Sequence, residues 1–303
     1  MDDRVEESYR WCRKLCRRSG SSFCWTFVLL PREQCNAMYS LYAFARISDD
    51  LADGEGSMLS RRKDLSSWLA LTESLDSDLN LSLATSVHCA SSPLWPSLKA
   101  VTLKYDIPTN LLTDIVGGVT KDLDHEQPRN WEELDEYCYL VAAAVGLACT
   151  RIWQADKAMP QQAAIDCGIA FQLTNILRDV ANDARLGRIY IPADEFARFG
   201  LDASSWLSGA PNGDWPSAIR SVAQRAEELY TSGWDTIKYL RPPSRRLFSL
   251  MWRYYHALLL EVLRNVDRLW EISRTRIPRL VRARLAMQHF IAPLYWSLPN
   301  PVH

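Results

Sequence analysis

Two stretches of this 303-residue chain decide its fold: Tyr42-Ala-Phe-Ala-Arg-Ile-Ser-Asp-Asp-Leu-Ala-Asp53 and Gln172-Leu-Thr-Asn-Ile-Leu-Arg-Asp-Val-Ala-Asn-Asp183. Polar side chains recur every three or four residues in both. They are Tyr42, Arg46, Asp49 and Asp53 in the first stretch, and Gln172, Asn175, Asp179 and Asp183 in the second. Because an α-helix advances about 100° per residue, each set lies on one helical face. The pattern predicts two helices with a polar stripe where a core-facing helix is normally apolar.

Each polar stripe carries two carboxylates one helical turn apart. If the two helices face each other, their oxygens form a cage suited to hard divalent cations. Mg²⁺ keeps several waters and prefers one or two carboxylates together with substrate phosphate oxygens. The stripes therefore predict a Mg²⁺ site that holds a diphosphate, with Mn²⁺ able to substitute. A solvated helix face is the alternative, and it explains one such stripe more easily than two.

Composition and charge narrow the class of protein. The sequence is 48% hydrophobic and has 12 Trp, 12 Tyr and 8 Phe, which is enough for a sizeable core. The formal net charge of −1 gives no indication of a nucleic-acid partner. The eight cysteines form no C-x-x-C pair, so we expect reduced thiols in a cytoplasmic protein. The N-terminus lacks the features of a signal peptide, and no run approaches the roughly 18 apolar residues of a membrane-spanning helix.

Helical periodicity runs through the chain, interrupted by short Gly and Pro clusters, and strand signals are almost absent. The expected helices cover residues 6–17, 32–51, 61–73, 93–105, 109–123, 131–154, 163–183, 215–240, 243–267 and 278–287. No connecting segment is long enough for a domain linker, and no repeat has a fixed period. We expect one domain over residues 1–303, an all-α fold formed by a single large helical bundle with a central cavity.

Motifs beyond the stripes carry a family resemblance. In chain order they are Ser21-Ser-Phe23, Leu29-Leu-Pro31, Tyr42-Ala-Phe-Ala-Arg46, Asp49-Asp-Leu-Ala-Asp53, Tyr137-Cys-Tyr-Leu-Val-Ala142, Val145-Gly146, Gln172-Leu-Thr-Asn-Ile-Leu-Arg-Asp179 and Gly187-Arg-Ile-Tyr-Ile-Pro192. Through them the sequence resembles the squalene/phytoene synthases, the trans head-to-head prenyl diphosphate synthases. The resemblance implies the class I isoprenoid synthase fold. It also implies a Mg²⁺-dependent prenyltransferase that joins two allylic diphosphates through a cyclopropylcarbinyl diphosphate.

The resemblance implies roles for single residues. The matched metal ligands are Asp49, Asp53, Asn175, Asp179 and Asp183. The matched substrate-binding positions are Ser22, Phe23, Tyr42, Arg46, Gln172, Asn175, Arg178, Tyr190 and Tyr255. Tyr139 matches a catalytic tyrosine that assists proton removal during cyclopropane closure. A buried phenol with a satisfied hydroxyl is the alternative for Tyr139.

The sequence departs from the family pattern at two positions. Asn182 stands where a second acidic residue often precedes the last aspartate, which lowers the local negative charge. Ala143 stands where glycine is common, and we expect its methyl group to affect the fit of the prenyl chain.

Substrate length and membrane contact rest on weaker patterns. Phe27 and Tyr39 lie near Phe23 and Tyr42, and as bulky tunnel residues they would favour C15 over C20 substrates. Packing away from the tunnel is the alternative. A basic stretch, residues 274–284, ahead of apolar residues 290–298 is compatible with peripheral contact to anionic lipid, with a solvated helix face as the alternative.

Three alternatives remain for function. A class I terpene cyclase would use one diphosphate, and a phytoene synthase would use C20 diphosphates instead of C15. A non-catalytic assembly factor or lipid-binding relative is the alternative from another class, although the intact aspartates argue against it. A di-iron bundle is disfavoured because no Glu-x-x-His occurs. The sequence leaves open the use of NADPH in a second half-reaction, and the oligomeric state.

Overall fold

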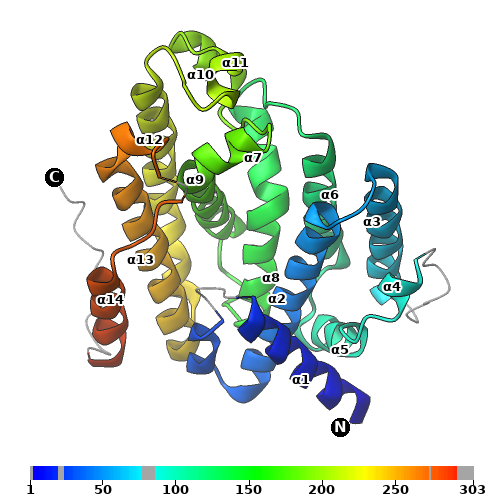
Figure 1. Ribbon diagram of the computed structural model, residues 1–303. Helices are drawn as coiled ribbons and strands as arrows, with labels where there is room; N and C mark the ends of the chain where they lie inside the picture. The colour runs from blue at the N-terminus through cyan, green and yellow to red at the C-terminus, as the bar shows by residue number, and fades with distance from the viewer. Residues whose placement is uncertain (1–2, 20–23, 77–85, 273, 292–303) are drawn as a thin grey trace.

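The computed structural model describes residues 3–19, 24–76, 86–272 and 274–291, and its regular structure there is entirely helical (Figure 1). The α-helices are α1 (Asp3–Arg18), α2 (Arg32–Asp53), α3 (Met58–Glu73), α4 (Val87–Ala90), α5 (Trp95–Tyr105), α6 (Thr109–Lys121), α7 (Trp131–Cys138), α8 (Ala144–Ile152), α9 (Gln161–Arg185), α10 (Ala193–Arg198), α11 (Ala203–Leu207), α12 (Trp215–Gly233), α13 (Pro242–Arg264) and α14 (Arg279–Ile291). Short 3₁₀ segments are η1 (Thr26–Leu29), η2 (Ser74–Asp76), η4 (Asp122–Asp124), η6 (Trp234–Tyr239) and η7 (Val266–Arg268). The all-α prediction is confirmed.

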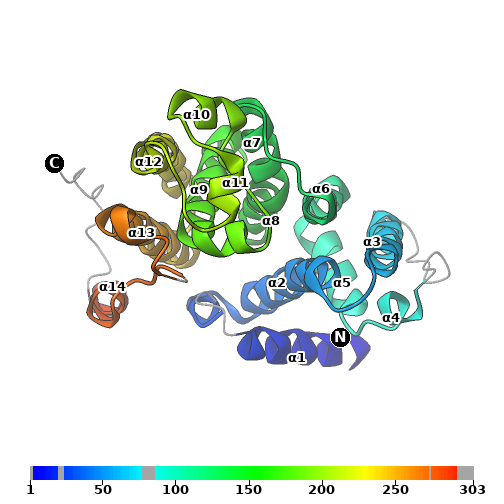
Figure 2. The same cartoon turned by 45° about the horizontal axis from the view of Figure 1, so that its top comes forward.

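The helices pack as a bundle around α8 and α9. Helix α9 contacts α8, α12 and α13, while α2 contacts α1, α3, α5, α6 and α8. Figure 2 shows α12 and α13 on one side of α8 and α9, and α1, α2, α3 and α5 on the other side. Helix α14 lies beyond α13. Within the described part of the chain, no helix is long and apolar enough to cross a membrane. One domain over residues 1–303 remains a prediction.

Helix α9 shows how the sequence places the second polar stripe. It begins after Pro160, whose fixed φ and missing N–H suit a helix start. Its buried face includes Leu173, Ile176 and Val180, and the polar stripe falls between these positions. The helix ends in a turn at Gly187, whose φ of +78° is readily adopted only by glycine. The chain then reverses, and the Arg188 N–H donates to the Asp183 carbonyl over 2.8 Å.

A π-helical segment, η5 (Tyr139–Ala143), joins α7 to α8 in the centre of the bundle. The predicted helix over residues 131–154 is therefore continuous in its path but changes its hydrogen-bond register. Such bulges are frequent at functional sites. The prediction missed α10 and α11, which contain only 6 and 5 residues and carry little periodic signal.

Ala143 packs against α9. It is fully buried, and a Cβ placed on Gly168 would lie 2.5 Å from its Cα. We had expected its methyl group to affect the prenyl chain. The structure instead places this residue in a helix contact, so that a glycine on α9 accommodates an alanine on η5.

Gly168→Ala should therefore destabilise the fold by about 1–3 kcal/mol, because the nearest atoms are backbone atoms that cannot move aside separately. Gly117→Ala is the matched control, since this α6 glycine has nothing within 4 Å of its added Cβ. It should gain about 0.5–1 kcal/mol from helix propensity. Thermal unfolding followed by circular dichroism measures both, and equal melting temperatures would contradict the close-contact argument.

Candidate active site

The four motif aspartates lie near the C-terminal ends of two helices, Asp49 and Asp53 on α2 and Asp179 and Asp183 on α9. An ion pair links the two groups, because Arg188, just after α9, reaches Asp53 with an Nη2–Oδ1 distance of 3.1 Å. The end of α2 is thus tied to the segment that follows α9, and the facing of the two stripes across a metal site stays a prediction.

Asp122, in η4, is a fifth carboxylate at this place, and the sequence analysis did not identify it. Its charge contributes to raising the pKa of both Asp49 and Asp183, so it lies within electrostatic reach of both helices. Two phenols donate to it: Tyr137 to Oδ2 over 3.1 Å and Tyr190 to Oδ1 over 2.9 Å.

The segment that carries Tyr190 is tied to the chain just after η4. The Ile189 N–H donates to Nε2 of His125 over 2.9 Å, and the Gln127 amide donates to the Ile191 carbonyl over 2.8 Å. Tyr190 also stacks on Tyr137, with ring centroids 5.1 Å apart. These contacts fix both phenols beside Asp122.

Burial and mutual repulsion perturb the carboxylates. Burial, and then the neighbouring charges of Asp53 and Asp122, raise the pKa of Asp49 to about 7 despite the opposing Arg46. Burial and the Asp179 charge raise the pKa of Asp183 to about 7. Protein atoms crowd Asp49 even though its side chain remains accessible to solvent. A cation placed among these carboxylates would stabilise the ionised forms.

The donor set fits a hard divalent cation held together with a phosphate. Asn175, on the same face of α9 as Asp179, has a buried Oδ1 without a hydrogen-bond partner, and its Nδ2 donates to Gln172 over 3.2 Å. Within the residues that the structure describes, no three His, Cys, Asp or Glu side chains are close enough to enclose a metal by themselves. Mg²⁺ does not need such an enclosure when substrate oxygens complete its coordination. Metal binding by Asp49, Asp53, Asn175, Asp179 and Asp183 remains a proposal.

Arginines surround the second motif. Arg178 is largely buried and its Nε donates to Asp179 Oδ1 over 3.0 Å. Arg274 also donates to that oxygen, with an Nε–Oδ1 distance of 2.9 Å. On the first motif, Arg46 pairs with Asp50 over 2.5 Å and is half exposed.

Arg274 keeps the solvent exposure expected of the basic stretch, but its ion pair with Asp179 was not foreseen from the sequence. Its neighbours Thr275 and Ile277 are buried, so the alternate residues of this segment face the protein. The alternation of residues from Arg274 to Ile277 was the sequence signal that one side of this segment packs against the bundle.

Of the remaining predicted substrate-binding residues, some are described by the structure and two are not. Tyr42 exchanges a 2.8 Å hydrogen bond with Ser19, and Tyr255 stacks on Phe171 with centroids 4.3 Å apart. Gln172 lies one turn before Asn175. Ser22 and Phe23 lie outside the described residues.

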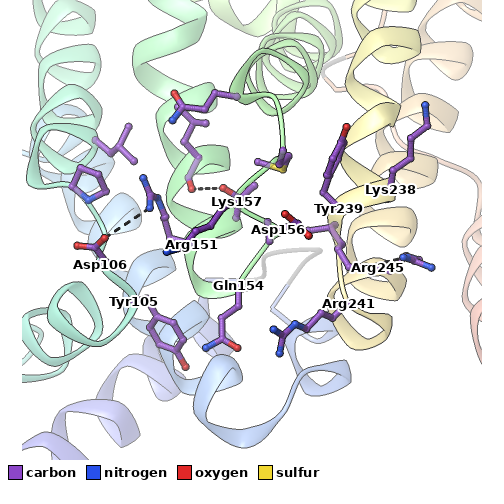
Figure 3. Close-up of a pocket in the computed structure, with 18 of the residues that line it drawn as sticks. Tyr105, Asp106, Arg151, Gln154, Asp156, Lys157, Lys238, Tyr239, Arg241 and Arg245 are labelled. Carbon is purple, nitrogen blue, oxygen red and sulfur yellow. Dashed lines mark hydrogen bonds and ion pairs between the residues drawn. The ribbon is translucent and has the colours of Figure 1, made fainter.

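The structure does not bring Tyr139 to the carboxylates. Its phenol faces Asp114, and burial together with that carboxylate raises the pKa of Tyr139. It lines an open hollow of about 1590 Å³ that extends to the start of α9 (Figure 3). Gln161, at the start of α9, also lines this hollow, and Asp179 lies about 27 Å from Gln161 along the helix axis at 1.5 Å per residue.

Several basic side chains line this hollow. Figure 3 shows Arg151 on the side of α8, and Arg241 and Arg245 across from it at the start of α13. Arg151 lies 3.9 Å from Asp106, and Arg245 donates to the Leu240 carbonyl over 3.2 Å. None of the four motif aspartates lines this hollow.

Comparisons with known proteins place the chain among relatives of one kind. The family model described as squalene/phytoene synthase matches residues 16–281. The phytoene synthase of Arthrospira platensis is 30% identical over 280 residues, covering 86% of this chain and 84% of that protein. The phytoene synthase of Mycobacterium tuberculosis is 29% identical, covering 97% of this chain and 96% of that protein.

Solved structures give the same result. A dehydrosqualene synthase in complex with a ligand superposes with a TM-score of 0.79 at 26% identity, covering 94% of this chain and 96% of that one. The squalene synthase HpnC from Alicyclobacillus acidocaldarius superposes with a TM-score of 0.77 at 22% identity, covering 88% and 97%, and shows a shared fold.

Proposed function

The chain belongs to the squalene/phytoene synthase family, and we propose that it joins two C15 allylic diphosphates head to head through a cyclopropylcarbinyl diphosphate. It is a prenyltransferase that acts on prenyl diphosphates, as the family is. The observation that carries the proposal is that Asp49, Asp53, Asp122, Asp179 and Asp183 lie close enough for their charges to raise the pKa of Asp49 and of Asp183. The family uses a divalent metal, which we propose is Mg²⁺ held by the motif carboxylates and Asn175.

The protein's own groups support ionisation of the allylic substrate. A bound divalent metal supplies positive charge that neutralises the leaving diphosphate. Arg178 forks onto both oxygens of Asp179, and a guanidinium fork of this kind can pair with phosphate oxygens instead once a metal occupies that carboxylate. The stacked pair of Phe171 and Tyr255 offers an aromatic face, which stabilises a carbocation without trapping it.

We propose Tyr137, in place of Tyr139, as the phenol at the reacting centre. It is buried, stacks on Tyr190 and donates to Asp122, whereas Tyr139 faces Asp114. Burial and the Asp122 charge raise the pKa of Tyr137, so the phenol stays protonated and acts as a hydrogen-bond donor. Asp122 can receive a proton through it during cyclopropane closure.

Incubation of the purified protein with C15 or C20 diphosphate and Mg²⁺, with and without NADPH, tests this function. Mass spectrometry of the extracted products distinguishes the cyclopropyl diphosphate from a hydrocarbon. Hydrocarbon formed only with NADPH would add a reductive second half-reaction. A single-substrate cyclised product would contradict head-to-head condensation and favour the terpene cyclase alternative.

Substrate length is proposed from two aromatic residues. Phe27 and Tyr39 are each only 3% exposed, and their rings meet edge to face with centroids 5.5 Å apart. Phe27 also lies 6.5 Å from the ring of Tyr42, on the polar stripe of α2. This aromatic group lies next to the proposed substrate positions, which supports a limit on chain length.

The wild type should therefore convert C15 diphosphate with a higher kcat/KM than C20 diphosphate. Phe27→Ala should raise the C20 rate, because it opens the volume of one large side chain. Each methylene in an apolar pocket is worth only about 1–3 kcal/mol, so some C20 conversion by the wild type is expected. Val28→Ala, at an exposed neighbouring position, is the matched control. A wild type that prefers C20 would overturn the C15 assignment.

The second candidate is phytoene synthesis from C20 diphosphate. The names of the relatives favour it, since those from Arthrospira platensis and Mycobacterium tuberculosis are both phytoene synthases. It shares the carboxylates and the first chemical step with the C15 reaction, so the same product assay decides between them.

A further inference from the structure

Two of the four motif carboxylates are ion-paired with arginines that lie outside the two motif helices. Asp53 on α2 accepts from Arg188, with an Nη2–Oδ1 distance of 3.1 Å. Asp179 on α9 accepts from Arg274, with an Nε–Oδ1 distance of 2.9 Å. Arg188 thus contacts the first motif and Arg274 contacts the second. Each arginine binds an oxygen that we have proposed as a metal ligand.

The backbone of Arg188 is fixed independently of its side chain. Its N–H donates to the carbonyl of Asp183 over 2.8 Å, immediately after the turn at Gly187. Its side chain spans from the end of α9 to the end of α2 and is 20% exposed. The guanidinium can therefore leave Asp53 by rotation of side-chain bonds, while the backbone stays in place.

The backbone of Arg274 is restrained by its buried neighbours. Thr275 and Ile277, which follow it, are buried at 4% and 3% exposure and fix this segment against the bundle. The Arg274 side chain is 52% exposed and ends on Asp179. It too can leave its carboxylate without a change in the backbone.

A guanidinium and a metal ion compete for the same carboxylate oxygen. The N–H donor and the metal use the same lone pairs, and the two positive charges repel at such short range. A partly exposed ion pair is also weak enough to be displaced. Phosphate oxygens are strong acceptors for a guanidinium fork, so a bound diphosphate gives a displaced arginine a new partner.

We propose that Arg188 and Arg274 are positioning residues that compete with the divalent cation for Asp53 and Asp179, so that metal binds strongly only together with a diphosphate. The proposal rests on the function proposed above. It makes metal and diphosphate binding mutually dependent, and thus protects the carboxylates from metal that arrives without substrate.

The test is a Mn²⁺ titration of the full-length protein, followed by the electron paramagnetic resonance signal of free Mn²⁺. Without diphosphate, Arg188→Gln should bind Mn²⁺ more tightly than the wild type, by on the order of threefold to tenfold, because a competing cation is gone. With inorganic diphosphate present, the order should reverse, since the variant lacks a donor for the anion. If Arg188 had a purely structural role, Arg188→Gln would weaken Mn²⁺ binding both with and without diphosphate.

Three variants make the result specific. Arg225→Gln, which breaks a comparable pair with Asp135 away from the motifs, should leave both affinities unchanged. Arg188→Lys keeps the charge and should restore wild-type Mn²⁺ affinity. Asp49→Asn should weaken Mn²⁺ binding, which locates the titrated site at the motifs.

Arg274→Gln repeats the measurement through Asp179, where Arg178 stays paired, so the gain in Mn²⁺ affinity should be smaller. It carries the proposal if Arg188→Gln fails to fold by circular dichroism. The proposal is overturned if the folded arginine variants bind Mn²⁺ no more tightly than the wild type without diphosphate. The titration uses no prenyl substrate, so its outcome is separate from the product assay. A protein that makes no prenyl product would refute the proposed function. The metal competition would still stand if the arginine variants bind Mn²⁺ more tightly without diphosphate and more weakly with it.

Discussion

Asp179→Asn should lower kcat for prenyl diphosphate condensation by about two to three orders of magnitude, because an amide cannot replace the charge of a metal-binding carboxylate. Asp179 lies at the centre of the second motif, with two arginines on it and Asn175 one turn away. Asp49→Asn should have a comparable effect through the first motif. Steady-state kinetics over a range of Mg²⁺ concentrations measures both variants, and the concentration giving half-maximal rate should rise. Removal of divalent metal with a chelator should abolish turnover of the wild type.

Asp166→Asn is the matched control for this experiment. It makes the same chemical change on the same helix, but Asp166 is paired with Gln162 near the opposite end of α9. Its activity should equal that of the wild type. Circular dichroism should show all variants folded, since these polar side chains are not part of the apolar core. Near-normal kcat in either Asp179→Asn or Asp49→Asn would refute the metal cage.

The helical fold was predictable because hydrophobic periodicity is strong wherever a helix spans several turns. Both polar stripes stood out against that periodicity, and this is why α2 and α9 were found with their carboxylates. The helices α10 and α11 were missed since they are too short to show a period. The π-helical segment η5 is equally invisible, because a change of hydrogen-bond register leaves side-chain polarity unchanged.

The candidate site was predictable only where its residues recur along one helix. Asp122 sits in a Thr-Lys-Asp-Leu-Asp run that is typical of a solvated helix end. Its importance comes from Tyr137 and Tyr190, which are 15 and 68 positions away in sequence. The contact of Arg274 was missed for the same reason, since its partner Asp179 lies almost a hundred residues before it. Contacts of this kind arise from the packing of elements and not from a local pattern.

The choice between Tyr137 and Tyr139 shows most clearly where the sequence pattern alone does not identify the site residue. Two residues apart on a helix means about 200° of rotation, so the two phenols cannot serve the same site. The motif Tyr-Cys-Tyr contains both, and sequence resemblance led us to the second. The structure places the first beside Asp122 and the second beside Asp114.

Tyr137→Phe should therefore slow formation of the cyclopropyl intermediate by about two orders of magnitude or more, the range expected for loss of a group that transfers a proton. Tyr139→Phe should leave the rate unchanged. Substrate affinity should change little in either variant, because the aromatic rings remain. Single-turnover measurements of the intermediate with saturating C15 diphosphate separate the chemical step from binding.

Tyr190→Phe separates a direct role of Tyr137 from a role in holding Asp122. Both phenols donate to Asp122, one to each oxygen, so either substitution removes one hydrogen bond from that carboxylate. If Tyr137 only holds Asp122 in place, the two variants should lose activity equally. If its hydroxyl takes part in proton removal, Tyr137→Phe should be much slower than Tyr190→Phe. A larger loss in Tyr139→Phe than in Tyr137→Phe would return the catalytic role to Tyr139 and would require its side chain to leave Asp114 during the reaction.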